Sequence, residues 1–280
     1  MKSKDEIRET VRAGYADIAA GKKTSCCGGG CGRGEKRSNH SNPKRLAQTL
    51  GYDAKKLAKL PAGANMGLSC GNPVAMAALK KGQVVIDLGS GGGFDVFQAG
   101  PKVGKSGRAI GVDMTPEMIS KARKNISFYK KMTGLDNAEF RLGEIENIPA
   151  ADGVADVIIS NCVINLSPDK PRVWKEIYRV LKRGGKAAVS DLALLKPLPK
   201  NVQEKAAALV GCVAGAVLVK ETESMLEKSG FKRVKLTPKP DYVKNMLAWN
   251  DPLYKEISAS LPKGAEMSDY IVSLSVEAYK

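Results

Sequence analysis

A short apolar segment that runs into a dense glycine turn constrains the fold of this chain more than any other feature. Residues 84–94 read VVIDLGSGGGF, so a β-branched run stops at Asp87 and glycine fills four of positions 89–93. Glycine leaves backbone N–H groups uncovered, and no side chain blocks the approach of a ligand to such a turn. Because the chain resumes with DVF, the segment predicts a strand, a ligand-binding turn and a helix.

The glycine pattern also separates two kinds of nucleotide-like cofactor. It reads D-x-G-x-G-x-G, the form found in S-adenosylmethionine (SAM) methyltransferases, and differs from the G-x-G-x-x-G turn of dinucleotide dehydrogenases. Asp113 ends the next predicted strand, near the spacing of about 20 residues at which an acid accepts hydrogen bonds from ribose hydroxyls. Two further acids, Glu144 and Glu146, follow the third predicted strand. Together these strand ends predict a SAM site.

Each part of the cofactor has an expected partner. Asp87 is placed to interact with the ammonium group of the methionine moiety, and Met114 to border the adenine. Ile145 is expected to cover the adenine, and Glu144 or Glu146 to accept a hydrogen bond from its amino group. The predicted cofactor-binding residues are Asp87, Gly89, Ser90, Gly91, Gly93, Asp113, Met114, Glu144, Ile145, Glu146 and Asn161.

Strands and helices alternate after residue 83, which predicts a parallel sheet with helices on both faces. Strands are expected at residues 83–88, 108–113, 138–143, 155–161, 185–191 and 231–237, and a last strand at 271–279 is expected to pair antiparallel to 231–237. The expected fold is therefore α/β, a doubly wound, mostly parallel, seven-stranded Rossmann-like sheet of the class I SAM-dependent methyltransferase type. An N-terminal cysteine-bearing arm and a C-terminal insertion before the last strand complete it.

Hydrophobic periodicity and turn residues predict where the helices lie and where the chain divides into structural units. Helices are expected at residues 1–20, 44–60, 73–80 and 169–182. A further helix is expected after Thr115, its N-cap, with a buried stripe of Ile119, Ala122, Ile126 and Tyr129. The expected units are an N-terminal helix and Cys/Gly-rich arm (1–43), the SAM-binding domain (44–238) and a C-terminal segment (239–280) whose residues 239–269 lie over the sheet.

Composition narrows the class of partner. The net charge is +16, but aromatic residues make up only 5%, so surfaces for base stacking are scarce and nucleic acid is not expected as a partner. The one histidine, His40, lies among Ser, Asn and Pro, which disfavours a Ser-His-Asp triad or a His-rich metal site. No run approaches the ~20 apolar residues of a membrane span, and the first residues lack the apolar segment of a signal peptide. We expect a cytoplasmic protein without a membrane partner.

Thiols are the second chemical feature of the chain. The six cysteines are Cys26, Cys27, Cys31, Cys70, Cys162 and Cys212. In a reducing cytosol they favour metal binding or redox chemistry over a disulfide framework. Cys162 follows the fourth predicted strand, at the edge where a doubly wound sheet binds its ligand. Cys70 and Cys212 lie near enough in the predicted topology for all three to converge over the cofactor, with buried core thiols at Cys162 and Cys212 as an equal alternative.

Six segments resemble the prokaryotic type of arsenite SAM methyltransferase. They are ANMGLSCGNP (64–73), residues 86–94, GVDMTPEMI (111–119), LGEIE (142–146), IISNCVINLSPDK (158–170) and GCVAGA (211–216). The likeness runs from about residue 40 to 235. Other methyltransferases share the cofactor segments in part, whereas the cysteine-bearing segments are much more particular to this family.

The resemblance implies SAM-dependent methylation of thiol-bound trivalent arsenic, for arsenic detoxification. Cys162 and Cys212 would hold the arsenic with Cys70 as a third thiol, and Cys70 and Cys162 would form a transient disulfide. An N-terminal cysteine, either Cys26 or Cys27, also belongs to the pattern. Thiolates are natural ligands of this soft ion. The implied partners are arsenite or its thiol conjugates and thioredoxin or glutathione as reductant, and the expected assembly is a monomer.

Three other functions stay open on the sequence. A methyltransferase of the same fold that acts on carbon, oxygen or a quinone ring needs only the cofactor motifs. A thiol protein that binds metalloids without turnover would not need the glycine turn or Asp113. An RNA methyltransferase would suit the net charge of +16, but no aromatic–basic interleaving supports it.

Overall fold

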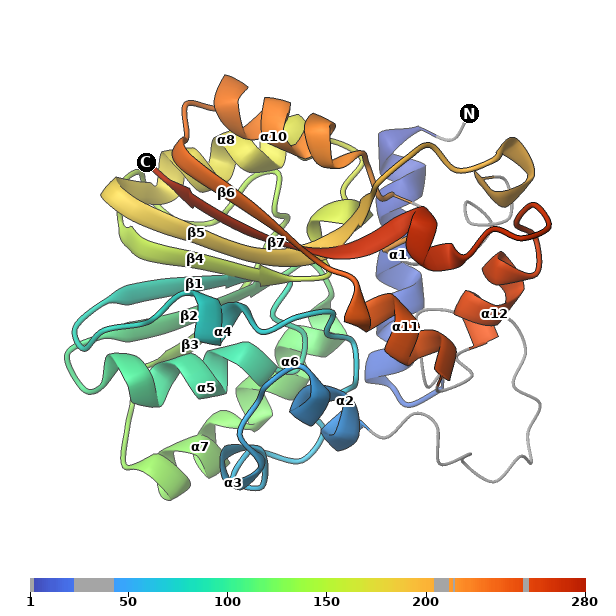
Figure 1. Ribbon diagram of the computed structural model, residues 1–280. Coiled ribbons are helices and arrows are strands. Elements are labelled where there is room, and N and C mark those ends of the chain that lie inside the picture. The colour runs from blue at the N-terminus through green and yellow to red at the C-terminus, as the bar shows by residue number, and fades with distance from the viewer. Residues whose placement is uncertain (1–2, 23–42, 204–211, 214, 249–251) are drawn as a thin grey trace.

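A computed structural model describes residues 3–22, 43–203, 212–213, 215–248 and 252–280. Within these residues, one sheet of seven strands has the order β3-β2-β1-β4-β5-β7-β6 (Figure 1). The strands are β1 (Val84–Leu88), β2 (Arg108–Asp113), β3 (Ala138–Leu142), β4 (Ala155–Asn161), β5 (Leu181–Leu194), β6 (Lys232–Lys239) and β7 (Ile271–Tyr279). Strands β1 to β5 pair in parallel, and β7 is antiparallel to both β5 and β6. The predicted doubly wound sheet is confirmed.

Helices cover both faces of the sheet (Figure 1). The helices are α1 (Lys4–Ala19), α2 (Pro43–Thr49), α3 (Ala54–Leu57), α4 (Pro73–Met76), α5 (Phe94–Val103), α6 (Pro116–Lys124), α7 (Ile126–Thr133), α8 (Lys170–Val180), α10 (Val219–Lys228), α11 (Asp241–Ala248) and α12 (Pro252–Ser258), with 3₁₀ turns η1 (Ile164–Leu166) and η2 (Met267–Asp269). One apolar core joins α8 and α10 to the sheet, and a second joins α5, α6 and α7 to its other face. Apolar runs such as VVIDL in β1 suit this arrangement, because a central parallel strand is buried on both faces.

The last strand lies inside the sheet and not at its edge. β7 pairs antiparallel with residues 232–239, as predicted, but it also pairs with β5 along its whole length. Its side chains are buried in an almost continuous run, and β6 forms the exposed edge instead. The alternating pattern of IVSLSVEAY identified the strand but not its second partner.

Helix α1 stands outside the two layers. Ser3 and Glu6 form a capping box at its start, because each side chain accepts a hydrogen bond from the other residue's backbone N–H. The helix packs against α6 and crosses the edge of the sheet at which the parallel strands end (Figure 1). The predicted helix over 1–20 is confirmed, and its position brings it next to the glycine turn.

The segment before β7 differs from its expected position. Residues 239–269 were expected over the sheet, but α11 and η2 pack beside the start of β7, and α12 packs against both. Because β7 runs antiparallel to β5, its first residue, Ile271, pairs with Leu194 at the end of β5. The segment therefore covers the carboxyl edge of the sheet, on the same side as α1 (Figure 1).

Four helix predictions need correction. The single helix expected over 44–60 is two, because Gly51 adopts a left-handed φ of 85° and Asp53 caps a new helix. The helix expected over 73–80 ends at Met76. The helix expected over 169–182 ends at Val180, since Leu181 already pairs with β4. Beyond Thr115 the helix breaks at Asn125 into α6 and α7; Ile119, Ala122 and Tyr129 are buried as expected, while Ile126 is half-buried.

Some predictions fall on residues or boundaries that the structure does not test, and one concerns a membrane span. Cys26, Cys27, Cys31 and His40 lie outside the described residues, and the domain boundaries at 43 and 238 stay predictions. Among the described residues, no helix combines the length and the apolar character needed to cross a bilayer.

Candidate active site

The turn after β1 is held tightly under a neighbouring loop. Gly89, Gly91 and Gly93 have φ values of 70°, 51° and 93°, which L side chains rarely adopt. A Cβ at Gly89 would lie 2.2 Å from Val163, the residue after Cys162. The backbone N–H groups of Gly89 and Ser90 donate to the carbonyl of Val112 in β2. Glycine is therefore required where the turn passes beneath the Cys162 loop.

Asp113 links the glycine turn to helix α6. Its carboxylate accepts hydrogen bonds from the backbone N–H of Gly91 at 2.9 Å and of Thr115 at 2.8 Å. Thr115 occupies the predicted N-cap position, but its own side chain makes no capping hydrogen bond. Burial raises the pKa of Asp113, and the two N–H donors oppose that shift. Each oxygen keeps a lone pair that can accept a ligand hydroxyl.

Two more carboxylates are buried behind the turn. Burial and the neighbouring charges of Asp95 and Asp113 raise the pKa of Asp87 well above its usual range. Burial raises the pKa of Asp95 to about 6, while hydrogen bonds from Tyr52 Oη (2.7 Å) and Asn161 Nδ2 (3.1 Å) oppose the rise. No ion pair among the described residues involves these acids, and acids held close together favour a positively charged ligand.

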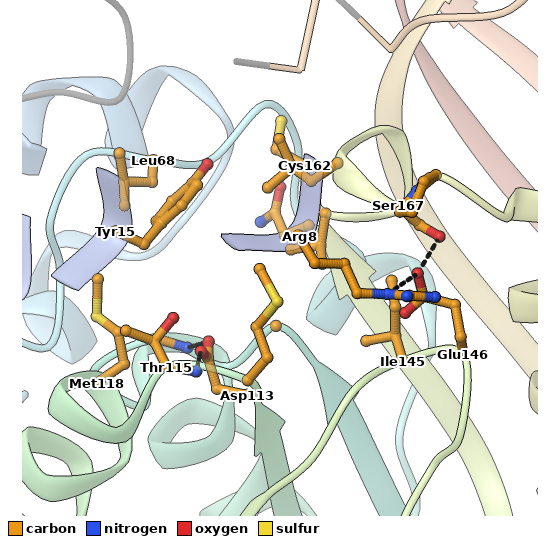
Figure 2. Close-up of a pocket in the computed structure, with 17 residues that line it drawn as sticks. Arg8, Tyr15, Leu68, Asp113, Thr115, Met118, Ile145, Glu146, Cys162 and Ser167 are labelled. Atoms are coloured by element: carbon orange, nitrogen blue, oxygen red, sulfur yellow. Dashed lines mark hydrogen bonds and ion pairs between the residues drawn. The ribbon is translucent and has the colours of Figure 1, made fainter. Parts of the chain in front are cut away.

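A pocket lies beside the glycine turn and Asp113 (Figure 2). It contains about 720 Å³ of empty space, open solvent included. Predicted cofactor residues that line it are Gly89, Gly91, Asp113, Met114, Ile145, Glu146 and Asn161. Those that do not line it are Asp87, Ser90, Gly93 and Glu144. Ser90 Oγ is buried without a hydrogen-bond partner among the described residues.

Helix α1 contributes pocket residues that the sequence did not predict. Arg8 and Tyr15 line the pocket beside Leu68, Met118 and Ser167, and Figure 2 shows them over the strand ends. The remaining unpredicted lining residues are Thr115, Val163, Leu166 and Pro168. The three- and four-residue spacing of apolar positions identified α1 as a helix, but such spacing carries no information about what the helix packs on.

Ion pairs fix α1 over the pocket. Arg8 Nε lies 3.4 Å from Glu146 and 3.6 Å from Glu144, and Arg12 reaches Glu144 at 3.2 Å. Ser167 Oγ donates a 2.7 Å hydrogen bond to Glu146. Glu144 and Glu146, one or the other of which is expected to accept a hydrogen bond from the adenine amino group, thus hold helix α1 against the pocket.

The three described cysteines meet at the loop that carries Cys162. A disulfide joins Cys70 and Cys162, 92 residues apart in the chain. Cys162 adopts a left-handed φ of 59°, and its N–H donates to Ser190 in β5. Cys212 Sγ lies 3.7 Å from the Cys162 carbonyl oxygen. The structure therefore brings together the three cysteines that the sequence singled out, and Cys162 also lines the pocket.

An apolar cluster surrounds these sulfurs. Cys70 and Cys162 are 1% and 5% exposed and pack with Leu192, Val213 and the C-terminal segment. The other buried members are Leu198, Val202, Val243, Met246, Tyr254, Ile257, Met267, Tyr270 and Ile271. The insertion before β7 thus supplies much of the apolar cover over the thiols.

The chain fits SAM as its cofactor. Asp113 offers acceptors for hydroxyl groups, and Met114, Met118 and Ile145 line the pocket with apolar side chains suited to a purine. The buried acids behind the turn suit the ammonium of a methionine moiety, and the orphaned hydroxyl of Ser90 offers one further hydrogen bond. Fold and pocket together define a class I SAM-dependent methyltransferase.

Comparison with known proteins agrees with this class and narrows it. Residues 79–230 match the methyltransferase domain family. The chain is 43% identical to the arsenite methyltransferase of Halobacterium salinarum over 285 residues, 99% of this chain and 67% of that protein. It is 37% identical to the human arsenite methyltransferase over 52% of this chain and 40% of that protein. The protein belongs to the arsenite methyltransferase family.

A solved structure gives the same relationship in three dimensions. The arsenic(III) S-adenosylmethionine methyltransferase of Chlamydomonas reinhardtii superimposes with a TM-score of 0.63 and 29% identity, covering 85% of this chain and 74% of that one. The present chain thus spans two thirds of the Halobacterium protein and less than half of the human protein.

Proposed function

We propose that this protein transfers the methyl group of SAM to trivalent arsenic held by cysteine thiolates, as a step in arsenic detoxification. The observation that carries the proposal is the position of Cys162. Cys162 lines the cofactor pocket, and its sulfur forms a disulfide with Cys70. Cys212 lies next to it, with its sulfur near the Cys162 carbonyl oxygen. A thiol site and a methyl-donor site that share one residue place the acceptor next to the donor.

The residues of the pocket would hold the cofactor as follows. Asp113 accepts hydrogen bonds from the ribose hydroxyls, while Met114 and Ile145 enclose the adenine. Asp87 faces the ammonium group from behind the turn. When bound, SAM supplies an electrophilic methyl group on a sulfonium. Glu144 and Glu146 keep α1 over the pocket through their ion pairs with Arg8 and Arg12.

Arsenic requires the reduced form of the thiol site. Two electrons and two protons delivered by an external thiol reductant open the Cys70–Cys162 disulfide. Three thiols then displace the three hydroxyl groups of arsenite as water, which leaves the arsenic lone pair exposed. Attack by that lone pair needs no general base, because arsenic bears no proton. Positioning therefore accounts for most of the contribution of this chain.

The disulfide is also a product of the cycle. Methyl transfer uses the arsenic lone pair and takes arsenic to the pentavalent state. Oxidation of two thiolates to one disulfide returns two electrons to arsenic, and Cys70 and Cys162 are the pair that the structure joins. We assign the next reduction to thioredoxin or glutathione, and we expect a cytoplasmic monomer. Cys26 or Cys27 stays the predicted fourth thiol.

The experiment is SAM turnover with arsenite and a thiol reductant, with methylated arsenic followed by mass detection. A reaction without arsenite is the control. Arsenite-dependent product establishes the reaction. Bound SAM without any arsenic product would contradict the proposal and move the acceptor to carbon or oxygen.

A further inference from the structure

The two thiols that flank the proposed arsenic position stand on separate elements. Cys162 directly follows β4, whereas Cys212 lies on the segment between β5 and α10. Between them, the contact from Cys212 Sγ to the Cys162 carbonyl oxygen is long, at 3.7 Å. One arsenic atom needs both sulfurs at a fixed separation, so another part of the structure must hold the two segments in register.

A buried polar bridge ties the Cys162 loop to the end of β5. The backbone N–H of Asn165 donates to Asp191 Oδ2 at 3.1 Å, and its side-chain amide donates to Asp191 Oδ1 at 2.9 Å and to the Leu192 carbonyl at 2.6 Å. Asn165 and Asp191 are 6% and 8% exposed. Hydrogen bonds to a buried carboxylate are strong and directional, so the loop after Cys162 is fixed in place.

The Cys212 segment packs against the same asparagine. A Cβ at Gly215 would lie 1.9 Å from the Asn165 carbonyl oxygen, so no residue with a side chain fits there without displacing the backbone. The segment is also anchored to β5, because the Leu194 N–H donates to the Val217 carbonyl at 2.8 Å. Asn165 therefore contacts both thiol-bearing segments.

Asp191 completes the arrangement next to the sulfurs. One of its carboxylate oxygens and the sulfurs of Cys70 and Cys162 all lie within 4.8 Å of one another. Its oxygens accept hydrogen bonds from Asn165 and from the N–H of Leu192 at 2.8 Å. These donors hold the carboxylate in one orientation, so it serves as the anchor of the bridge.

We propose that Asn165, anchored by Asp191 and packed under Gly215, is a positioning residue that sets the separation of Cys162 and Cys212 for one arsenic atom. The inference rests on the proposed function, because it assumes that these thiols hold arsenic. Asn165 itself touches neither arsenic nor cofactor in this role. It acts through the two segments that carry the sulfurs.

A two-thiol version of the full chain tests the geometry directly. Serine at Cys26, Cys27, Cys31 and Cys70 leaves Cys162 and Cys212 as the remaining thiols. The probe is phenylarsine oxide, whose arsenic exchanges its oxygen for two thiol sulfurs with release of one water. We expect one probe per chain in this background. Asn165→Ala and Gly215→Ala should each weaken probe affinity by about tenfold or more, as misplacement of a reacting group does.

Asn137→Ala is the matched control. Asn137 is 7% exposed and its side chain donates to the carbonyls of Gly100 and Gly104, so its loss also leaves buried groups without partners. It lies on the α5 side of the sheet, away from the thiols. Its removal should lower the midpoint of thermal unfolding, as Asn165→Ala does, without changing probe affinity.

The outcomes separate the two levels of the proposal. A background protein that does not bind one probe per chain contradicts the assignment of the thiols, and with it the proposed function. Tight binding that survives both Asn165→Ala and Gly215→Ala overturns the positioning role alone. Gly215→Ala leaves every hydrogen bond of Asn165 available. It therefore tests the positioning role by itself if Asn165→Ala does not fold.

Discussion

Arg8 of helix α1 lies 3.4 Å from Glu146, which follows β3, and this pair joins the start of the described chain to the cofactor pocket. Glu146 also accepts a hydrogen bond from Ser167, three residues before the end of the Cys-bearing segment at 170. One carboxylate thus connects α1, the adenine side of the pocket and the loop that carries Cys162. The cofactor pocket is completed by a helix remote in sequence from the glycine turn.

Removal of the ion pair between Arg8 and Glu146 should lower the affinity of the pocket for SAM. For Arg8→Gln we expect affinity to fall about three- to tenfold, between the small effect of an exposed pair and the large effect of a buried one. Isothermal titration with SAM measures the change. Arg108→Gln is the control, because Arg108 pairs with Glu139 at the opposite ends of the strands. Equal losses in the two variants would contradict a specific role for α1.

Cys162 and Cys212 should be required for arsenic chemistry and not for cofactor binding. Cys162→Ser and Cys212→Ser are expected to abolish arsenite methylation, because a hydroxyl does not replace a soft thiolate ligand. The affinity for SAM should stay nearly unchanged in both variants. Product analysis and calorimetric titration of the same preparations give the two measurements. Methylation that persists in both variants would refute the assigned ligands.

Asp113 should contribute to cofactor affinity through its carboxylate. Asp113→Ala removes hydrogen bonds to a charged acceptor, and such bonds contribute about 1–3 kcal/mol each. The dissociation constant of SAM should therefore rise at least tenfold. Asp136→Ala serves as control, since Asp136 is exposed and pairs with Lys130 on the surface. Unchanged titration curves for Asp113→Ala would count against the ribose assignment.

Affinity for SAM should fall as the pH drops through about 6. Burial raises the pKa of Asp95 to about 6, and a cationic ligand binds best when this carboxylate is ionised. Below that pH a proton must leave before the ligand binds, so the dissociation constant should rise by up to about tenfold per pH unit. Titrations between pH 5 and 7 in buffers of different ionisation heat will report this proton release.

The same group predicts a change in stability without ligand. Because the folded pKa of Asp95 exceeds the unfolded value of 3.8, its contribution to the free energy of unfolding is complete below pH 3.8 and is lost as the pH rises toward 6. Asp95→Asn should weaken both pH dependences, while Asp87 and Asp113, whose pKa values are also raised, still contribute. A pH profile for SAM binding that is identical in wild type and Asp95→Asn would exclude this carboxylate as the titrating group.

Much of the fold was predictable, because its central strands are uninterrupted apolar runs bounded by turns. The residues VVIDL and ADVIISN have few alternatives to buried parallel strands. The position of β7 between β5 and β6 was not predictable, because alternation defines the faces of a strand and not its neighbours. Two predicted helix ends were wrong. A turn at Gly51 interrupts the helix expected over 44–60, and the strand pairing that begins at Leu181 ends α8 at Val180.

Some residues of the candidate site could be predicted from the sequence, and others could not. Gly89, Asp113 and Cys162 belong to local motifs, so the sequence identified them. Arg8 and Tyr15 reach the pocket only because α1 folds back across the sheet. The Asn165–Asp191 bridge joins the 3₁₀ turn η1 to β5 across 26 residues of chain, and no spacing rule covers that contact. Whether each predicted residue acts as proposed stays a prediction for the experiments above.

On the proposed function, the apolar side chains around Cys70 and Cys162 would also affect which oxyanions reach the thiols. Arsenate and phosphate are anions at neutral pH, and removing an anion from water costs several kcal/mol that an apolar cluster does not return. The Asp191 carboxylate, within 4.8 Å of both sulfurs, adds repulsion. Arsenite enters as an uncharged hydroxide and avoids both penalties. On the proposed function, arsenite would thereby be favoured over abundant phosphate by the charge of the molecule, before any sulfur–arsenic bond forms.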